Sequence, residues 1–267
     1  MPVRLGVHAD RLTAIRTLHA AKGRRQSGRF AFEGPTLLRE AHANNFPIEE
    51  IYATQEAYDA EPLVAQLEAA GTAAFVIEPR SAQKISDLET PPGIVAVSAM
   101  KFATLEEIFG GDGVVLVLAD LNDPGNAGTL LRTADAFGCR GAVAGSTGTD
   151  PYHPKVVRAA MGALFRLPVA VAQPDDVARA AAAAGFEVAG LAAKGEPLGA
   201  SPLPRRAALA VGNERHGLGR WEAILSRRLA IPMLGRADSL NAAVAGSIAL
   251  YEATKAAGVP LPVEQRN

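Results

Sequence analysis

The strongest constraint on the fold is a series of short, almost uninterrupted apolar runs in the second half of the chain. Segments with a helical pattern separate six such runs, which are VVLVLADL, GAVAGS, RLPVAVA, FEVAGLAA, AALAVG and RLAIPM. Strands that are apolar on both faces are typical of a parallel sheet covered by helices on both sides. We therefore expect a doubly wound, mostly parallel α/β domain that ends in a long helix over Ser239–Gly258.

The first hundred residues also alternate between helical and strand patterns and indicate a smaller α/β domain. The expected strands are residues 29–34, 48–54, 73–79 and 93–100, and the expected helices are residues 11–21, 35–44, 60–71 and 81–89. Between the two halves, Lys101–Gly113 combines a short helical pattern with glycines, which is typical of a linker. The predicted organisation is a domain over 1–100, a linker over 101–112 and a domain over 113–267.

Overall charge gives no sign of a nucleic-acid partner, because 27 Lys and Arg residues are balanced by 28 Asp and Glu residues. Such a role therefore needs a local basic patch. The best candidate is Lys22–Arg29, where Lys22, Arg24, Arg25 and Arg29 occur without an acidic residue. The patch is compatible with RNA binding and equally with an ordinary solvated loop.

The chain has a single cysteine, Cys139. One cysteine excludes an intramolecular disulfide and a thiolate-rich metal site, and it fits a reducing compartment. No apolar run approaches the roughly 18 residues of a membrane span, and the first residues lack the apolar core of a signal peptide. We expect a cytoplasmic protein that uses neither a membrane nor a metal, with Cys139 as a small core residue.

Ligands of open α/β sheets bind at the carboxyl ends of the strands, so polar residues that follow the apolar runs are the first candidates for a site. The run VVLVLADL is followed by Asn126 and, about two helical turns later, by Arg132. The glycines there match neither the dinucleotide fingerprint nor the P-loop, which argues against both kinds of nucleotide site. The residues alone are also compatible with Asn126 as a helix N-cap and with an Arg132–Asp135 pair on the helix surface.

Two further strand ends carry candidates. The run AALAVG ends at Gly212, and Glu214 follows among turn-forming residues. Glycines beside a single acid allow backbone groups to approach a ligand closely. The run RLAIPM leads through a glycine-containing loop to Ser239 and Asn241 at the start of the last helix, where Asp238 or Ser239 would also serve as an ordinary cap.

Together, the three segments resemble the motifs of the SpoU (TrmH-type) RNA 2′-O-ribose methyltransferases of the SPOUT superfamily. The matching patterns are NxxxxxR at Asn126–Arg132, GNExxGL at Gly212–Leu218 and IPMxGxxxSLNxxxA at Ile231–Ala245. Their order, spacing and strand context agree, and the resemblance covers about Val114–Ala257. The segment RFAFEGPTLLREA resembles the opening of the L30e-like substrate-binding domain found in many members of this family.

The resemblance implies a deep trefoil knot in the C-terminal domain and S-adenosylmethionine held in that knot. The residues that it implies for cofactor binding are Leu191, Gly212, Asn213, Ile231, Met233, Leu240 and Asn241. Those that it implies for catalysis are Asn126, Arg132, Glu214, Ser239 and Asn241. Family proposals make Arg132 the group that removes the proton of the ribose hydroxyl, but a guanidinium does not readily give up its own proton. We therefore expect Arg132 to clamp a phosphate and to stabilise the developing alkoxide.

Members of this family generally act as homodimers through the C-terminal domain. The small residues Ala242, Ala245, Gly246 and Ala249 of the last helix suit such close packing, and they suit an intramolecular core equally well. The resemblance also places the basic patch Lys22–Arg29 in the RNA-binding domain. The expected substrate is a 23S-type ribosomal RNA, with transfer RNA as the alternative. A non-catalytic RNA-binding or ribosome assembly factor is the less favoured interpretation, because the motif residues are intact.

Overall fold

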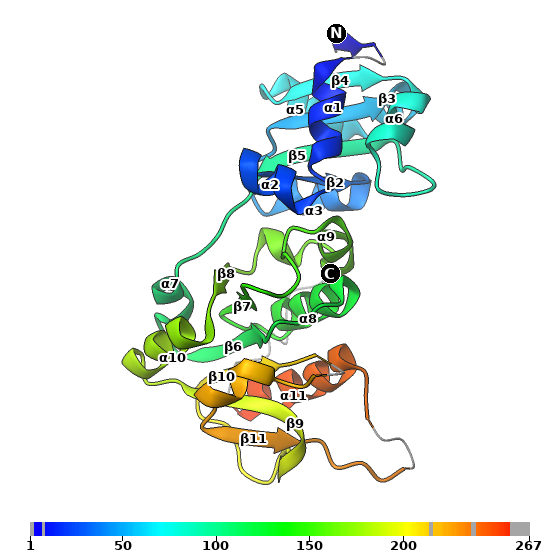
Figure 1. Cartoon of the computed structure of the whole chain (residues 1–267). Helices are drawn as coiled ribbons and strands as arrows, with labels where there is room; N and C mark the ends of the chain where they lie inside the picture. The colour runs from blue at the N-terminus through cyan, green and yellow to red at the C-terminus, as the bar shows by residue number, and fades with distance from the viewer. Residues whose placement is uncertain (1–2, 7–8, 214–215, 236–238, 257–267) are drawn as a thin grey trace. The chain divides into compact units, whose positions relative to one another are not determined.

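The computed structural model describes residues 3–6, 9–213, 216–235 and 239–256 of the chain (Figure 1). The chain divides into two compact units. The N-terminal unit consists of Met1–Lys101 and Tyr152–Arg166, and the C-terminal unit consists of Phe102–Pro151 and Leu167–Asn267. The N-terminal unit is therefore not continuous in sequence, because the chain leaves the C-terminal unit after Pro151 and returns to it at Leu167.

The N-terminal unit is built on a five-stranded mixed sheet with the strand order β1-β4-β3-β5-β2. Strands β1, β4 and β3 are parallel, whereas β5 is antiparallel to both β3 and β2. The strands are β1 (Val3–Leu5), β2 (Arg29–Glu33), β3 (Glu50–Thr54), β4 (Ala73–Ile77) and β5 (Ile94–Ala99). The helices are α1 (Asp10–Thr17), α2 (Ala21–Ser27), α3 (Pro35–Ala43), α4 (Gln55–Ala60), α5 (Pro62–Ala69), α6 (Pro79–Ile85), α9 (Pro154–Ala160) and the 3-10 helix η1 (Ala163–Phe165). The expected strands are confirmed as β2 to β5, and the expected helices as α1, α3, α5 and α6, with ends that differ by a few residues.

The basic segment Lys22–Arg29 is mostly helical, because α2 covers it up to Gly28, whose φ is +68°. Arg24 turns inward and is only 1% exposed. Its guanidinium donates hydrogen bonds of 2.8 and 2.9 Å to two carbonyl oxygens that follow α1. These bonds satisfy backbone groups that the end of a helix leaves unpaired. The segment is therefore mostly a helix and not a loop, while Lys22 and Arg25 remain exposed to solvent.

Aromatic side chains join Tyr152–Arg166 to the sheet of the N-terminal unit. The ring centroids of Tyr152 and Phe30 lie 4.5 Å apart, and those of Phe165 and Phe46 lie 5.0 Å apart. All four rings are buried, so the segment completes the core of this unit. The first segment of this unit ends at Lys101, close to the expected boundary at residue 100, whereas Tyr152–Arg166 was expected in the second domain. Sequence patterns report neighbours along the chain, and these contacts join residues far apart in it.

The C-terminal unit is built on a six-stranded sheet with the order β11-β9-β10-β6-β7-β8, in which every pairing is parallel. The strands are β6 (Gly113–Leu118), β7 (Gly141–Gly145), β8 (Val169–Ala172), β9 (Glu187–Pro197), β10 (Arg206–Val211) and β11 (Arg227–Ala230). The helices are α7 (Leu105–Phe109), α8 (Pro124–Ala136), α10 (Pro174–Ala183), α11 (Ala242–Ala256) and the 3-10 helix η2 (Gly219–Ile224). The prediction of a mostly parallel α/β sheet is confirmed, while the trefoil knot stays a prediction.

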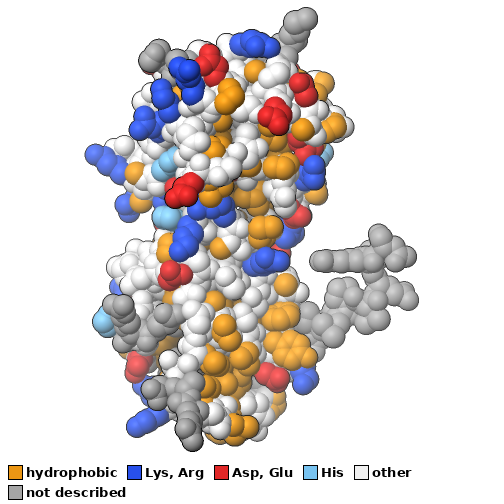
Figure 2. All heavy atoms as spheres, turned by 90° about the vertical axis from the view of Figure 1, so that its right-hand side faces the viewer, with side chains coloured by type: hydrophobic (Ala, Val, Ile, Leu, Met, Phe, Trp, Pro, Cys, Tyr) orange, Lys and Arg blue, Asp and Glu red, His pale blue; other side chains and the backbone are white. Residues whose placement is uncertain are grey.

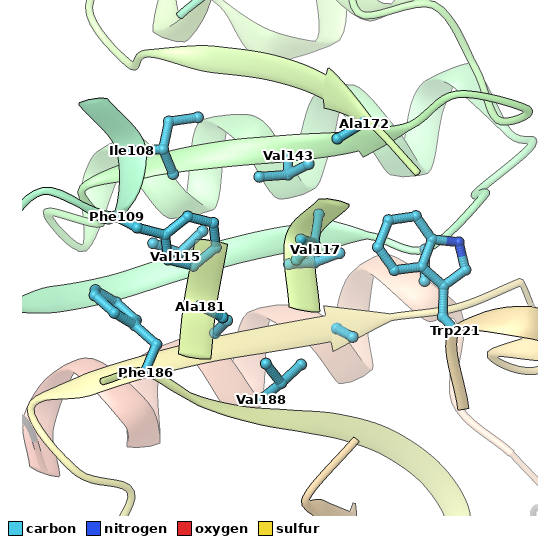
Figure 3. Close-up of a cluster of buried hydrophobic side chains, with 14 of the residues drawn as sticks. Ile108, Phe109, Val115, Val117, Val143, Ala172, Ala181, Phe186, Val188 and Trp221 are labelled. Carbon is cyan, nitrogen blue, oxygen red and sulfur yellow. The ribbon is translucent and has the colours of Figure 1, made fainter. Parts of the chain in front are cut away.

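The segment expected as a linker contributes to the core of the C-terminal unit. Its helix α7 begins with a capping box between Thr104 and Glu107. The side chains of Ile108 and Phe109 are 0% and 2% exposed and pack with residues of the sheet and of α10 (Figure 3). The ring of Phe109 lies edge-on to Phe186 with the centroids 5.0 Å apart. The glycines after α7 are typical of a linker, but its three apolar residues pack against the core, Ile108 and Phe109 fully buried and Leu105 partly buried.

Two features bear on the expected environment of the protein. Within the described ranges, no helix is both long and apolar enough to cross a membrane. Cys139 is buried, as expected for a small core residue, and burial together with the charge of Asp135 raises the pKa of its thiol to about 12. The thiol is therefore protonated at neutral pH and is not a reactive nucleophile.

Candidate functional site

A cavity of about 330 Å³ lies beside β9 and beyond the carboxyl ends of β10 and β11. Its lining residues are Leu191, Ala192, Ala193, Val211, Gly212, Asn213, Gly217, Ile231, Met233, Ser239, Leu240, Ala242 and Ala245. All the residues expected to bind the cofactor are among them except Asn241, and Ser239, expected for catalysis, is there too. No charged residue occurs among the described residues of the lining. The fold thus brings three distant segments to one neutral pocket.

The cavity has room because the pairing of β9 is interrupted. Strand β9 is in register with β11 at residues 189–190 and again at residues 196–197, but residues 191–195 have no register partner in β11. The register of β9 with β10 also ends at Gly190. Residues 191–193 lie in this interval and line the cavity. Backbone N–H and C=O groups outside a regular ladder can bind a ligand. The short side chains of Ala192 and Ala193 leave room for it.

The loop after β10 forms the next wall and is closed by its own backbone. Asn213 and Gly217 exchange two backbone hydrogen bonds, each of 2.8 Å. A Cβ at Gly212 would lie only 2.2 Å from the carbonyl oxygen of Gly217, so this position has no room for a side chain. Glycine at this motif position is therefore required by a close approach of backbone to backbone. Glu214, expected for catalysis, lies outside the described residues.

The third wall leads into α11, whose first turn is capped by Asn241. Its Oδ1 accepts the backbone N–H groups of Ala243 at 2.9 Å and Val244 at 3.2 Å. Ser239, one of the two alternative caps, is instead an exposed residue of the cavity rim, and Asp238 lies outside the described residues. The cap fixes the Asn241 side chain, and its Nδ2 donates a hydrogen bond of 3.0 Å to Asn126 Oδ1.

Asn126 and Arg132 both lie on α8, which follows β6. The N-cap of α8 is Asp123, whose Oδ1 accepts the Asn126 N–H at 2.7 Å, so the cap alternative for Asn126 is wrong. Arg132 is exposed, and it forms neither a hydrogen bond nor an ion pair with any residue that the structure describes. The alternative of a surface pair with Asp135 is therefore wrong as well. Arg132 keeps its five N–H donors for a partner outside the described chain.

Close packing of α8 on α11 holds the two asparagines together. A Cβ at Gly246 would lie 2.5 Å from Leu130 Cδ2, so the glycine sets the distance between the helices. Thr133 Oγ1 and Ser247 Oγ are 3.0 Å apart and bond across the same contact. The small residues Ala242, Gly246 and Ala249 are buried inside the unit, and Ala245 lines the cavity. Of the two alternatives for this face, intramolecular packing is confirmed.

The four basic residues expected to bind RNA fall into two groups. Lys22 and Arg25 are exposed, whereas Arg24 is buried with backbone partners. Arg29 pairs with Glu49 at 2.7 Å and with Glu50 at 3.1 Å. Burial lowers the pKa of Arg29, but hydrogen bonds and charges from Glu50 and Glu49 outweigh it and raise this pKa above its ordinary value. Only Lys22 and Arg25 of this patch are thus displayed for an RNA phosphate.

The sequence motifs missed part of the cavity wall. Ala192 and Ala193 follow Leu191 directly, and Val211 precedes Gly212. The only signal for them is their position at the end of an apolar run, which many core residues share. No group of three or more His, Cys, Asp or Glu residues that could hold a metal ion occurs in the part of the chain that the structure describes.

Comparison with known proteins agrees with this geometry. Residues 113–251 match the SpoU rRNA Methylase family, and residues 10–96 match the MRM3-like substrate binding domain. The 23S rRNA (guanosine(2553)-2′-O)-methyltransferase RlmP of Bacillus subtilis (strain 168) is 33% identical over 88% of this chain and 92% of its own length. The 23S rRNA (uridine(2479)-2′-O)-methyltransferase of Streptomyces viridochromogenes is 37% identical over 62% of this chain and 61% of its own length.

A solved structure gives the same result over nearly the whole chain. The AdoMet-bound rRNA methyltransferase from Sinorhizobium meliloti superposes with a TM-score of 0.84 at 29% identity, over 94% of this chain and 97% of that chain. The fold, the site and these matches define an RNA 2′-O-ribose methyltransferase that uses S-adenosylmethionine. The chain belongs to the SpoU rRNA methylase family, which confirms the resemblance drawn from the three motifs.

Proposed function

We propose that this enzyme methylates the 2′-hydroxyl of one ribose in 23S ribosomal RNA, with S-adenosylmethionine bound in the cavity beside β9. The observation that carries the proposal is the hydrogen bond between Asn241 and Asn126, because it joins the wall of the cavity to the helix that bears Arg132. The choice of 23S rRNA is supported by the relatives from Bacillus subtilis and Streptomyces viridochromogenes, whose names specify that substrate.

The cavity fits the cofactor in its chemistry. S-adenosylmethionine combines a flat nucleoside with an amino-acid chain, and such ligands bind in largely apolar pockets with a few polar groups. Leu191, Ile231 and Leu240 supply apolar surface, while the irregular backbone of residues 191–193 and of Gly212 supplies hydrogen-bonding groups. Bound there, S-adenosylmethionine supplies an activated methyl group for in-line attack by a ribose oxygen.

The residues beyond the cavity orient the ribose. Arg132, whose donors have no partner among the described residues, binds the phosphate beside the target ribose and stabilises negative charge on the 2′-oxygen, and the proton leaves to that phosphate or to water. Asn126 and Asn241 fix the position of the ribose relative to the cavity. Ser239 on the rim and Glu214 complete the site by hydrogen bonding. Such alignment matters because the rate of an in-line transfer falls steeply with small misplacements.

We propose that the N-terminal unit binds the RNA through Lys22 and Arg25. Neutralising both as Lys22→Gln and Arg25→Gln should weaken RNA binding and lower the salt slope of log Kd by about one to two, because each lost phosphate contact contributes nearly one. Arg179→Gln on α10 is the matched control, since Arg179 is exposed but pairs with Asp176 on the same helix. An unchanged salt slope in the double variant would show that Lys22 and Arg25 do not contact RNA phosphates.

We propose a homodimer formed through the outer face of α11. Val244, Ile248 and Tyr251 are 48%, 39% and 49% exposed and follow one another at helical spacing. Figure 2 shows hydrophobic side chains gathered on one face of the C-terminal unit with few charged ones among them. Light scattering after size exclusion should give a dimer for the wild type and a monomer for Ile248→Glu. Val171→Glu is the control, because Val171 is 45% exposed on β8; a monomeric wild type at micromolar concentration contradicts the proposal.

We also propose that the enzyme works in the reducing cytoplasm. The support is the single cysteine of the chain, which is buried and has no partner for a disulfide. Fractionation of cells that express a tagged full-length chain tests this proposal. Recovery with the soluble cytoplasmic fraction is the expected result, and recovery in a membrane or extracellular fraction contradicts it.

The deciding experiment is methyl transfer from radiolabelled S-adenosylmethionine to unmodified 23S rRNA and, separately, to transfer RNA. The labelled RNA is hydrolysed in alkali and mapped. Label in alkali-resistant dinucleotides of 23S rRNA is expected, because a 2′-O-methyl group blocks cleavage at its own nucleotide. Label in transfer RNA alone would show that transfer RNA, and not 23S rRNA, is the substrate. Binding of the cofactor without transfer to either RNA or to ribosomal particles would favour the non-catalytic alternative.

A further inference from the structure

A second polar cluster lies beyond the ends of β6, β7 and β8, outside the cavity, and Arg220 is at its centre. Arg220 Nε donates to Asp120 Oδ2 at 2.7 Å, and Nη2 donates to Asp120 Oδ1 at 3.2 Å. Nη2 also reaches Ser146 Oγ at 3.3 Å and Thr147 Oγ1 at 3.2 Å, while Nη1 donates to Gln173 Oε1. All three guanidinium nitrogens are therefore used, and the partners come from the ends of three different strands.

The backbone of Asp120 shows that its position is tightly constrained. Its φ is +50°, which makes it one of three non-glycine residues with positive φ in the described ranges. Room for it comes from two glycines: a Cβ at Gly145 would lie 2.2 Å from Asp120 Oδ1, and a Cβ at Gly148 would lie 2.9 Å from Asp120 Cα. A left-handed backbone is unfavourable for a residue with a side chain, so the surroundings must hold Asp120 in place.

The two partners stand next to the two loops that must be aligned for catalysis. Asp120 lies between the end of β6 and the loop that leads to Asn126. Arg220 lies on η2, two residues after Leu218, which ends the motif loop beside the cavity. Leu218 and Trp221, on either side of Arg220, are 3% and 0% exposed, so η2 is anchored in the core. Through η2, the ion pair therefore connects the loop that leads to Asn126 with the motif loop that ends at Leu218.

We propose that Asp120 and Arg220 are positioning residues for methyl transfer, a role that rests on the proposed function of the same site. The Asn126–Asn241 hydrogen bond holds the two sides together at the first turn of α8, and the Asp120–Arg220 pair holds them together at the end of β6. With both contacts in place, residues 121–126, which form the loop before α8 and its first turn, have a fixed orientation relative to the cavity. The pair acts through Asn126 and Arg132 and does not touch the reacting atoms.

This role predicts a specific kinetic signature. An exposed ion pair contributes little to stability, and Arg220 is 42% exposed at its side chain, so its loss should hardly change the melting temperature. A misaligned ribose, in contrast, lowers the rate of transfer at saturating substrate by up to about 100-fold. The affinity for the cofactor should stay the same, because neither residue lines the cavity.

The test compares Asp120→Asn, Arg220→Gln and the double variant with the wild type, as full-length chains. Asparagine tolerates the left-handed backbone, so Asp120→Asn removes the charge without forcing the fold to change. Arg228→Gln is the matched control, because Arg228 makes an exposed pair with Glu222 at 3.1 Å near the same loop but joins no two motif segments. The measurements are single-turnover rate, KM for RNA, Kd for the cofactor and melting temperature.

We expect each single variant to lose about tenfold or more in single-turnover rate, and the double variant to be no slower than the worse single one, because both remove the same contact. Arg228→Gln should keep the wild-type rate. Rates within about twofold of the wild type overturn the proposal, as does a rate loss that is additive. A raised KM for RNA at an unchanged rate overturns it in favour of Arg220 as a direct phosphate contact.

A second measurement keeps this proposal separate from the proposed function. Hydrogen–deuterium exchange reports the order of residues 121–126 without any substrate. Faster exchange there in Asp120→Asn and Arg220→Gln, but not in Arg228→Gln, supports the positioning role even if the wild type proves inactive on every RNA tried. Unchanged exchange together with normal rates shows that the pair is an ordinary surface contact.

Discussion

The two halves of the parallel sheet carry different kinds of chemical groups at the carboxyl ends of their strands. Beside β9, β10 and β11, the surface consists of backbone and small or apolar side chains, and no described residue of the cavity lining is charged. Beyond β6, β7 and β8, the surface carries Asp120 and Arg220, with Arg132 on the helix that follows. A backbone wall suits a nucleoside, whereas the guanidinium of Arg132 suits a phosphate of RNA. Under the proposed function, the methyl donor binds at one half of the sheet and the RNA is held from the other, so substitutions in the two halves should change different constants.

The largest effect should come from Arg132 on the charged half. Arg132→Ala should lower the rate of transfer by about 100- to 1,000-fold, the size seen when one preorganised donor is removed from a developing oxyanion. The Kd of the cofactor, measured by calorimetry, should stay within about threefold, because Arg132 does not line the cavity. Arg179→Ala on α10 is the control and should behave as the wild type.

Arg132→Lys sharpens this prediction. Lysine keeps the charge but loses the fork of donors that binds a phosphate in two places, so part of the lost rate should return. Near wild-type turnover in Arg132→Ala would show that Arg132 has no role in the reaction. A cofactor affinity that falls together with the rate would show that the two halves are not separate.

The next largest effect should come from the backbone half. Gly212→Ala should weaken cofactor binding by about 100-fold, because the added Cβ would lie 2.2 Å from a carbonyl oxygen and the loop must move. Gly217→Ala is the matched control in the same loop. Its φ is +59° and an added Cβ meets no atom within 4 Å, so only a backbone cost of about 1–2 kcal/mol is expected. Equal losses in the two variants would contradict the close-approach argument.

A smaller effect is expected where the halves meet, at Asn241 and Asn126. Asn241→Asp keeps an oxygen to cap α11 but removes the Nδ2 donor to Asn126, so it should slow transfer at nearly unchanged stability. Asn241→Ala should lose the cap as well and lower the free energy of unfolding by about 1 kcal/mol. Urea unfolding and single-turnover kinetics measure the two effects. If Asn241→Asp transfers methyl at the wild-type rate, the bridge is structural only.

The two halves also differ in how far the sequence predicts them. The resemblance to the three motifs singled out Gly212 and the segments around Ile231 and Leu240, and at Gly212 the close approach of backbone to backbone gives a physical reason for the motif residue. All of them line one cavity. The apolar runs predicted the parallel strands for a related reason, since a strand buried on both faces must be apolar throughout.

Contacts between residues far apart in the chain could not be predicted. Nothing in the sequence pairs Asp120 with Arg220, because an acid after a strand and an arginine near a turn are each common on any surface. The same limit applies to Tyr152–Arg166, whose aromatic residues complete the core of the N-terminal unit. It applies to Arg24 too, because a basic run looks alike whether one of its side chains turns inward or not.

The smallest expected effect is on how the stability of the fold depends on pH. Here too the two halves of the sheet should differ. Burial raises the pKa of Asp120, but hydrogen bonds from Arg220 outweigh it and hold this pKa below its ordinary value. The folded protein therefore binds the Asp120 proton less readily than the unfolded chain does. Its contribution to stability is complete above the unfolded pKa of about 3.9 and is lost as the pH falls through the lower folded value.

Asp120→Asn removes this titration, so the melting temperature of the wild type should exceed that of the variant at pH 7 by at most a few degrees, and the difference should shrink below about pH 4. In an Arg220→Gln background, Asp120→Asn should change the pH dependence less than it does in the wild type, because the strongest group that lowers the pKa of Asp120 is gone, while the hydrogen bond from the Thr147 N–H remains. Gly212→Ala, from the backbone half, should lower stability by the same amount at every pH, since it changes no charge. Parallel melting curves for the wild type and Asp120→Asn from pH 7 to pH 3 would show that the ion pair does not govern Asp120, and the electrostatic contrast between the two halves would then rest on Arg132 alone.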